Sequence, residues 1–183
     1  MPISDNATLV PAGGYIFLAP TDTEKPITIT DPLAPGVKWV NIGHTSLDDL
    51  PEFARDGDDP ETKGSWQNAK LRQTSPSVTY SISFQSIQAD AEIYRLYFGA
   101  GTSAVQTDGS FRIPASATPQ ERALLLILVD GSKYLPLWHP KVSLLGSDAV
   151  SMSTDDFVKF PIKATLLGST LIGNGIGEWA VLS

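Results

Sequence analysis

Hydrophobic and polar residues alternate along much of the chain, most clearly in SVTYSISFQSI at residues 77–87. Apolar side chains occupy every second position from Val78 to Phe84, and small polar residues fill the positions between them. Successive side chains of a strand point to opposite faces of a sheet, so a period of two marks a strand with one buried face. The stretch therefore predicts a β-strand with one apolar and one polar face.

Shorter apolar runs, bounded by glycine or proline, predict further strands. Two runs within residues 122–138 are separated by Asp130-Gly131, the strongest short hairpin signal in the chain. A second hairpin is expected at the turn Ser75-Pro76, with residues 65–74 pairing with residues 77–87. The remaining strands are expected at residues 15–19, 37–42, 141–146, 149–153, 158–168 and 176–182.

Residues 89–101 have a helical pattern instead. Asp90 suits a helix N-cap because its carboxylate can accept a hydrogen bond from a free backbone N–H, and Gly99 suits the position after the last turn. We expect a short amphipathic helix that packs across the sheet and places its aromatic residues in the core. Its apolar face should consist of Ile93, Tyr94, Tyr97 and Phe98.

Together these elements predict a fold that is mainly β, an antiparallel β-sandwich or partial barrel with one short helix. The length of 183 residues suits a single domain, residues 1–183, with a core large enough to be stable without crosslinks. The chain contains no cysteine, so disulfides and thiolate metal sites are excluded.

Composition also bears on location and partners. No apolar run approaches the roughly 18 residues of a membrane span, and the N-terminal sequence lacks the basic segment and apolar block of a secretory signal. We therefore expect no membrane anchor and synthesis in the cytoplasm. The net charge of -7 and the pI near 4.7 argue against tight binding of nucleic acid, which depends on Lys and Arg.

Most of the excess negative charge lies in one connection, residues 43–64, which we expect to be a long loop. The stretch Gly43–Trp66 has seven acidic and two basic residues, a local charge of -5. Asp56 and Asp58 do not begin a calcium-binding loop, because Glu61 stands where that loop requires glycine. Apolar residues interrupt the acids, as in a segment that docks on a partner.

Other patterns give no catalytic or metal site above background. His44 and His139 are too far apart in sequence to form a local pair, and no G-x-S-x-G motif occurs. The glycines of residues 173–177 lead into a strand, without the helix that a phosphate-binding loop requires. We therefore expect a protein that is not an enzyme and needs neither a cofactor nor a metal ion.

The segment NIGHTSLDDLPEFARDGDDPETKGSWQNAKLRQT, residues 41–74, resembles the major tail tube proteins of long-tailed, non-contractile bacteriophages, in particular those that infect actinobacteria. Further similar segments follow in the same order, and together they cover most of the chain. They are the alternating strand at 77–87, IYRLYFGAG (93–101), FRIP (111–114), ERALLLILVDG (121–131) and DDFVKFPIKATLL (155–167).

The resemblance implies a structural virion protein, made and assembled in the host cytoplasm, whose hexameric rings stack into a hollow tail tube. It also implies that the long loop, residues 43–64, contacts neighbouring subunits, and that an N-terminal arm, residues 1–14, helps to join rings. The expected partners are other copies of the chain, a tape-measure protein, and tail terminator and tip proteins. Within the loop, the candidate contact residues are Leu47, Asp48, Asp49, Leu50, Phe53 and Arg55.

A tube that delivers DNA should let it pass without specific binding, because each phosphate neutralised by a basic wall would add affinity. An uncharged polar face would suit the lumen, although the same face could instead meet solvent or a second sheet. The candidate lumen face consists of Ser77, Thr79, Ser81, Ser83 and Gln85.

Two alternatives remain at this point. A tube protein of a contractile injection or secretion system would have a similar architecture and a surface that binds a sheath. A carbohydrate-binding β-sandwich would need its tryptophans on one exposed face, although burial is the more common fate of tryptophan in strands. The four tryptophans are Trp39, Trp66, Trp138 and Trp179.

Overall fold

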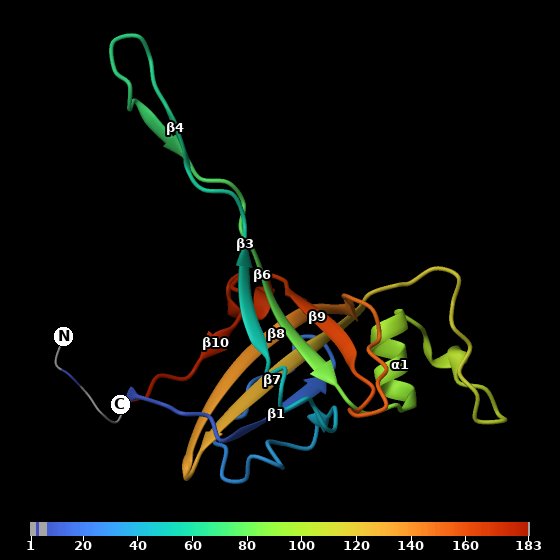
Figure 1. The fold of residues 1–183 in the computed structure, drawn as a ribbon. Helices are drawn as coiled ribbons and strands as arrows, with labels where there is room; N and C mark the ends of the chain where they lie inside the picture. The colour runs from blue at the N-terminus through green and yellow to red at the C-terminus, as the bar shows by residue number, and fades with distance from the viewer. Residues whose placement is uncertain (1–2, 4–6, 183) are drawn as a thin grey trace.

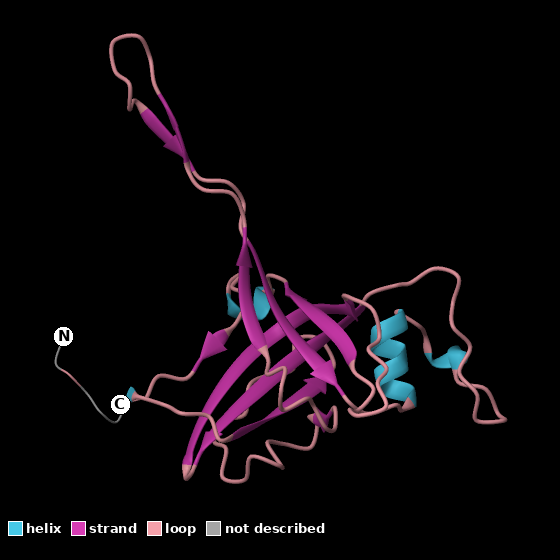
Figure 2. Cartoon of the chain, in the orientation of Figure 1, coloured by secondary structure: helices cyan, strands magenta, loops and turns pink. Residues whose placement is uncertain are grey.

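A computed structural model describes residues 3 and 7–182, which form one curved antiparallel sheet, an α-helix packed against it and a hairpin that projects from it (Figure 1 and Figure 2). The strand order of the sheet is β2-β1-β7-β8-β9-β6-β3, and β10 pairs with β8. Its strands are β1 (Gly13–Ala19), β2 (Val40–Asn41), β3 (Glu52–Asp56), β6 (Thr79–Ser86), β7 (Gln120–Asp130), β8 (Lys133–Gly146), β9 (Phe160–Leu166) and β10 (Glu178–Trp179).

The remaining elements lie outside this sheet. Helix α1 (Ala91–Phe98) packs against β8 and β9, and two short 3₁₀ helices span Thr102–Ala104 and Thr170–Ile172. The projecting hairpin contains β4 (Glu61–Lys63) and β5 (Arg72–Thr74).

The sheet curls until its two ends meet. After β2, which pairs with β1, the chain crosses to β6, where Thr45 pairs with Ser86. The Ile87 N–H donates to the His44 carbonyl (3.0 Å), and the Ser46 N–H donates to the Gln85 carbonyl (2.9 Å). These bonds satisfy backbone groups that an open sheet would leave at its edge.

The curled sheet encloses a core built from residues of nearly every strand and of α1. Ile16 of β1, Ile82 of β6 and Leu144 of β8 are buried in one cluster, together with Ile93 and Leu96 of the helix. A second cluster covers the opposite face of β1 and β7; it includes Phe17, Ala19, Leu125, Ile127, Trp138 and Trp39. The structure thus confirms a mainly β, antiparallel fold with one helix among the described residues, consistent with a β-sandwich.

Several predicted elements are confirmed by the structure. The hairpin at Asp130-Gly131 joins β7 to β8, and Ile82 and Phe84 are buried as the alternation of residues 77–87 predicts. The Asp90 carboxylate accepts the Ile93 N–H (2.9 Å) and caps α1. Gly99 ends the helix with a φ of 59°.

The hairpin predicted at Ser75-Pro76 is wrong. Residues 72–74 pair with residues 61–63, whereas β6 pairs with β3 on one edge and β9 on the other. The predicted loop at residues 43–64 is likewise partly strand, because β3 and β4 lie within it. Neither β4 nor β5 packs on a core, so neither has the alternating apolar residues by which a strand is recognised.

Other strand predictions are wrong in extent. Residues 141–146 continue β8 through Pro140 rather than forming a new strand. At residues 149–153, Ser151 alone pairs, with Lys159, and the strands predicted at 37–42 and 176–182 shrink to β2 and β10. Outside the strands, Trp39 and Ile42 are buried in the two core clusters, whereas Val37, Met152 and Val181 are exposed.

The C-terminal segment is held by buried His139. The Trp179 indole N–H donates to His139 Nε2 (3.1 Å), so the ring proton lies on Nδ1, which is 2.8 Å from the Ile176 carbonyl. Burial lowers the pKa of His139, and the hydrogen bond to Ile176 offsets this only in part. The segment around β10 is therefore bound to a neutral imidazole.

Acidification is expected to destabilise the protein through His139. Because the folded state has the lower pKa, the unfolded state binds more protons once the pH falls below about 6.5, and the free energy of unfolding decreases from there downward. Urea unfolding between about pH 8 and about pH 5, followed by tryptophan fluorescence, measures this slope. His139→Gln should flatten it, and an unchanged slope in the variant would contradict the assignment.

Replacing Gly99 with alanine should cost more stability than the same change at Gly131. Both have nearly the same positive φ, 59° and 58°, which costs an alanine about 1 kcal/mol. A Cβ on Gly99 would also lie 2.7 Å from the Thr118 backbone nitrogen, whereas nothing lies within 4 Å of one on Gly131. We expect Gly99→Ala to cost at least about 2 kcal/mol more in urea unfolding; equal costs would exclude the backbone clash.

Candidate functional site

Residues 57–78, termed the arm, leave the sheet where β3 ends and β6 begins and project away from it as a long hairpin (Figure 1). Glu61 pairs with Thr74 and Lys63 with Arg72, so the two strands of the arm, its limbs, are joined by backbone pairing. Every residue from 57 to 75 is exposed. An isolated two-stranded hairpin is marginally stable in water, so the arm gains most from packing on a partner.

Charge changes sign along the arm. Its base is acidic, with Asp58 and Asp59, whereas residues 63–72 at its tip contain three basic residues and no acid. Two large apolar side chains lie in the tip, the fully exposed Trp66 and the largely exposed Leu71. The basic residues of the tip are Lys63, Lys70 and Arg72.

The segment before the arm, residues 44–56, lies on its own sheet. Lys159 Nζ donates to Asp49 Oδ2 (2.9 Å) and lies 2.9 Å from Asp156 Oδ2, and the Ser46 hydroxyl also donates to Asp49. The ammonium group lowers the pKa of Asp49 and of Asp156, and the two carboxylates raise the pKa of Lys159. Asp49 is therefore held within its own subunit.

A groove of about 480 Å³ opens beside this segment, at the end of β6 farthest from the arm; we term it the acidic groove. Leu47 and Leu50 line it and are 83% and 58% exposed. No Lys or Arg lines it among the described residues. Its carboxylates belong to Asp48, Asp49, Glu52 and Asp148.

The structure divides the six predicted contact residues. Leu47, Asp48 and Leu50 are exposed at the acidic groove, whereas Asp49 is bound to Lys159. Phe53 packs on Tyr80 and Trp179 of its own subunit, with ring centroids 5.7 and 4.9 Å apart. Arg55 lies exposed on β3. None of the six lies on the arm.

Sequence reasoning missed the β4–β5 hairpin that forms the arm and the exposed position of Trp66 at its tip. Two signals were available: the local change from acids to bases, and the lack of hydrophobic alternation on either side of Gly64. The tryptophans do not share an exposed face, because Trp39 and Trp138 are buried, Trp66 is on the arm and Trp179 packs on Phe53. They form no platform for a sugar.

The predicted lumen face is only partly exposed. Ser81 is fully buried, and its hydroxyl has no hydrogen-bond partner among the described residues. Lys163 of β9, which pairs with Ser83, reaches across β6 to Asp56 of β3 (3.3 Å) and so passes over Ser81. Of the other predicted residues, Ser77 and Thr79 are exposed, and Ser83 and Gln85 are half-buried.

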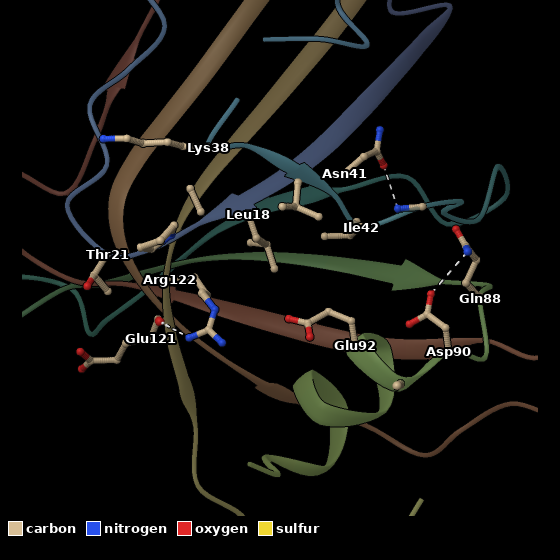
Figure 3. Close-up of a pocket in the computed structure, with 15 residues that line it drawn as sticks. Leu18, Thr21, Lys38, Asn41, Ile42, Gln88, Asp90, Glu92, Glu121 and Arg122 are labelled. Atoms are coloured by element: carbon tan, nitrogen blue, oxygen red, sulfur yellow. Dashed lines mark hydrogen bonds between the residues drawn. The ribbon is translucent and has the colours of Figure 1, made fainter. Parts of the chain in front are cut away.

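A larger cavity of about 880 Å³ lies between β1–β2 and the start of α1 (Figure 3). Apolar Leu18 and Ile42 line it together with charges of both signs, among them Lys38, Glu92 and Arg122. Among the described residues, no three His, Cys, Asp or Glu side chains could hold a metal ion together. The same part of the chain has no helix long and apolar enough to span a membrane.

Comparison with known proteins identifies the family. A family described as phage tail tube protein matches residues 1–179. The chain is 34% identical over 175 residues to the major tail protein Gp23 of Mycobacterium phage D29, covering 90% of this chain and 86% of the relative. It is also 34% identical over 179 residues to Gp23 of Mycobacterium phage L5, with the same coverage. The chain therefore belongs to the phage tail tube protein family, and it is a structural component of the virion tail.

Proposed function

We propose that this protein forms hexameric rings that stack into the tube of a non-contractile phage tail, and that the tube conducts DNA during infection. Membership of the tail tube family supports self-assembly into a tube. The arm is the single observation that best supports contacts between subunits, because it extends into solvent with an exposed tryptophan at its tip. Such a segment is stabilised when it packs on another copy.

Exposed apolar side chains outside the arm support an assembled state. Soluble monomers rarely expose large contiguous apolar patches, and obligate interfaces bury about 2,000 Å² or more in total. In this protein the exposed apolar residues lie mainly in loops around the sheet, where neighbours can cover them. They include Ile27, Leu33, Val37, Leu47, Leu50, Val105, Ile113, Met152 and Phe157.

The N-terminal arm is proposed to join one ring to the next. Residues 1–2 and 4–6 of this arm lie outside the described residues. The C-terminal end of this N-terminal arm is fixed to its own subunit. The Ala12 N–H donates to the Val129 carbonyl (2.9 Å), and the Val10 N–H donates to the Asp130 carboxylate (3.2 Å). A contact with another ring would therefore involve the residues before Val10.

The proposed conduit relies on weak interaction with DNA. The chain carries a net charge of -7, so long-range electrostatics oppose binding to phosphate. We place the exposed start of the polar face of β6 at the lumen, where Ser77 and Thr79 would form an uncharged strip and Lys163 is neutralised by Asp56. The protein would act by assembly rather than catalysis, with tape-measure, terminator and tip proteins as its other partners.

The purified wild-type chain is expected to form rings with six-fold symmetry that stack into hollow tubes. Rotational closure limits the ring, whereas stacking along the axis is open-ended. Negative-stain microscopy with class averaging shows both features directly. A stable monomer by size-exclusion chromatography with light scattering, at all concentrations tested, would contradict self-assembly.

Removing the arm should abolish tubes and leave a folded subunit. A Cβ on Gly57 would lie 3.3 Å from the Val78 Cα, so a two-residue Asn-Gly turn can join Gly57 to Val78 in place of residues 58–77. We expect an unchanged circular dichroism spectrum, a melting temperature within a few degrees of wild type, and no tubes in negative stain. Tubes at wild-type yield would show that the arm is dispensable, and loss of folding would show that it supports its own subunit.

A further inference from the structure

We propose that the basic tip of the arm of one subunit docks in the acidic groove of the next copy of this chain. This inference rests on the proposed function, because it assumes that copies assemble, and it names the surface that receives the arm. The donor is the basic tip, residues 63–72, and the acceptor is the groove at the far end of β6.

The two surfaces are complementary in charge and in polarity. The tip carries three basic residues and no acid. In the groove, Lys159 Nζ binds Asp49 Oδ2 (2.9 Å) and lies 3.9 Å from Asp48 Oδ2, so one cation faces two of the four carboxylates and the groove keeps a net negative charge. The Asp48 side chain is 79% exposed. Opposite charges at a partly desolvated interface favour one orientation and reject like-charged surfaces.

Apolar side chains accompany the charges on both sides. Trp66 and Leu71 lie among the bases of the tip, and Leu47 and Leu50 lie among the acids of the groove. All four are largely exposed in the free subunit. An aromatic side chain that fills a pocket ringed by charged groups is typical of the residues that dominate binding energy.

The geometry favours a second copy over the same one. The arm leaves the sheet beside Thr79 at the start of β6, whereas the groove is lined by residues 83–85 at the end of that strand. The arm points away from the sheet, so its tip cannot reach its own groove (Figure 1). Each limb has about eleven residues and extends about 35 Å at roughly 3.3 Å per residue, enough to reach a neighbour.

A donor at one end and an acceptor at the other make the contact heterologous. Such contacts repeat head to tail and produce closed rings or open stacks rather than isolated dimers. The larger cavity beside α1 suits the tip less well, because its three acids are accompanied by Lys38 and Arg122, whereas four acids and no Lys or Arg line the acidic groove among the described residues. The acidic groove is the acceptor that the charges favour.

A charge-swap experiment tests this contact. One variant reverses the tip, Lys70→Glu with Arg72→Glu, and the other reverses the groove, Asp48→Lys with Glu52→Lys. All four side chains are exposed, so both variants should fold. Asp49 is left unchanged because it binds Lys159. Pelleting and negative stain should show at least about a ten-fold loss of tubes for each variant alone.

Mixing the two variants in equal amounts should restore tubes to within about two-fold of wild type. In an alternating assembly each contact then joins either two native surfaces or two reversed surfaces, so the charges match again. This recovery excludes misfolding as the cause of the loss. A matched control, Glu24→Lys with Asp155→Lys, reverses two exposed acids outside the groove and should assemble as wild type does.

The results of these experiments distinguish failure of the arm-to-groove contact from failure of the proposed function. If the wild-type chain forms no tubes, the proposed function fails and the docking fails with it. If wild type forms tubes and the reversed variants do so equally well, or the mixture does not recover, the tube stands and the arm-to-groove contact is overturned. Loss in each variant and recovery in the mixture support the contact.

Discussion

The pairing of β6 on both edges is the constraint on which the other features depend. β3 pairs with one edge and β9 with the other, while Ile82 and Phe84 point into the core. A slip of one residue would expose these side chains and bury the polar ones, so the register is fixed by the core. The arm continues from one end of this strand and the groove lies at the other, so the same register sets the distance and direction between them.

The acidic residues of the segment 43–64 have two different roles, which the amino-acid composition alone does not distinguish. Lys159 Nζ lies 2.9 Å from Asp49 Oδ2 and 3.9 Å from Asp48 Oδ2 and so fixes the segment that leads into β3, while the Asp48 side chain stays 79% exposed. Ion pairs at a protein surface contribute little to folding stability. The contribution of Lys159 is therefore mainly positional: it ties the groove segment at Asp49 to Asp156, next to β9.

Sequence reasoning predicted the elements that bury a face and missed those that do not. The helix capped by Asp90 and the hairpin at Asp130-Gly131 depend on local chemistry, and both were found. The arm has no core to pack on, so hydrophobic alternation could not reveal it. Ser81 lies on the polar face that the alternation predicts but is buried, beneath an ion pair between Asp56 and Lys163, which are distant in the chain. Such contacts follow from strand order, which one sequence does not provide.

An exposed arm with a tryptophan at its tip is a hazard for a free subunit, and the distribution of charge limits that hazard. The net charge of -7 makes random encounters between copies repulsive, whereas the tip is locally basic. Approach with the tip toward another copy's acidic groove is thus attractive when most other orientations are not. Because the donor and acceptor are different surfaces, one contact leaves a free arm and a free groove, and growth can continue. The same charges that keep subunits apart therefore direct how they join.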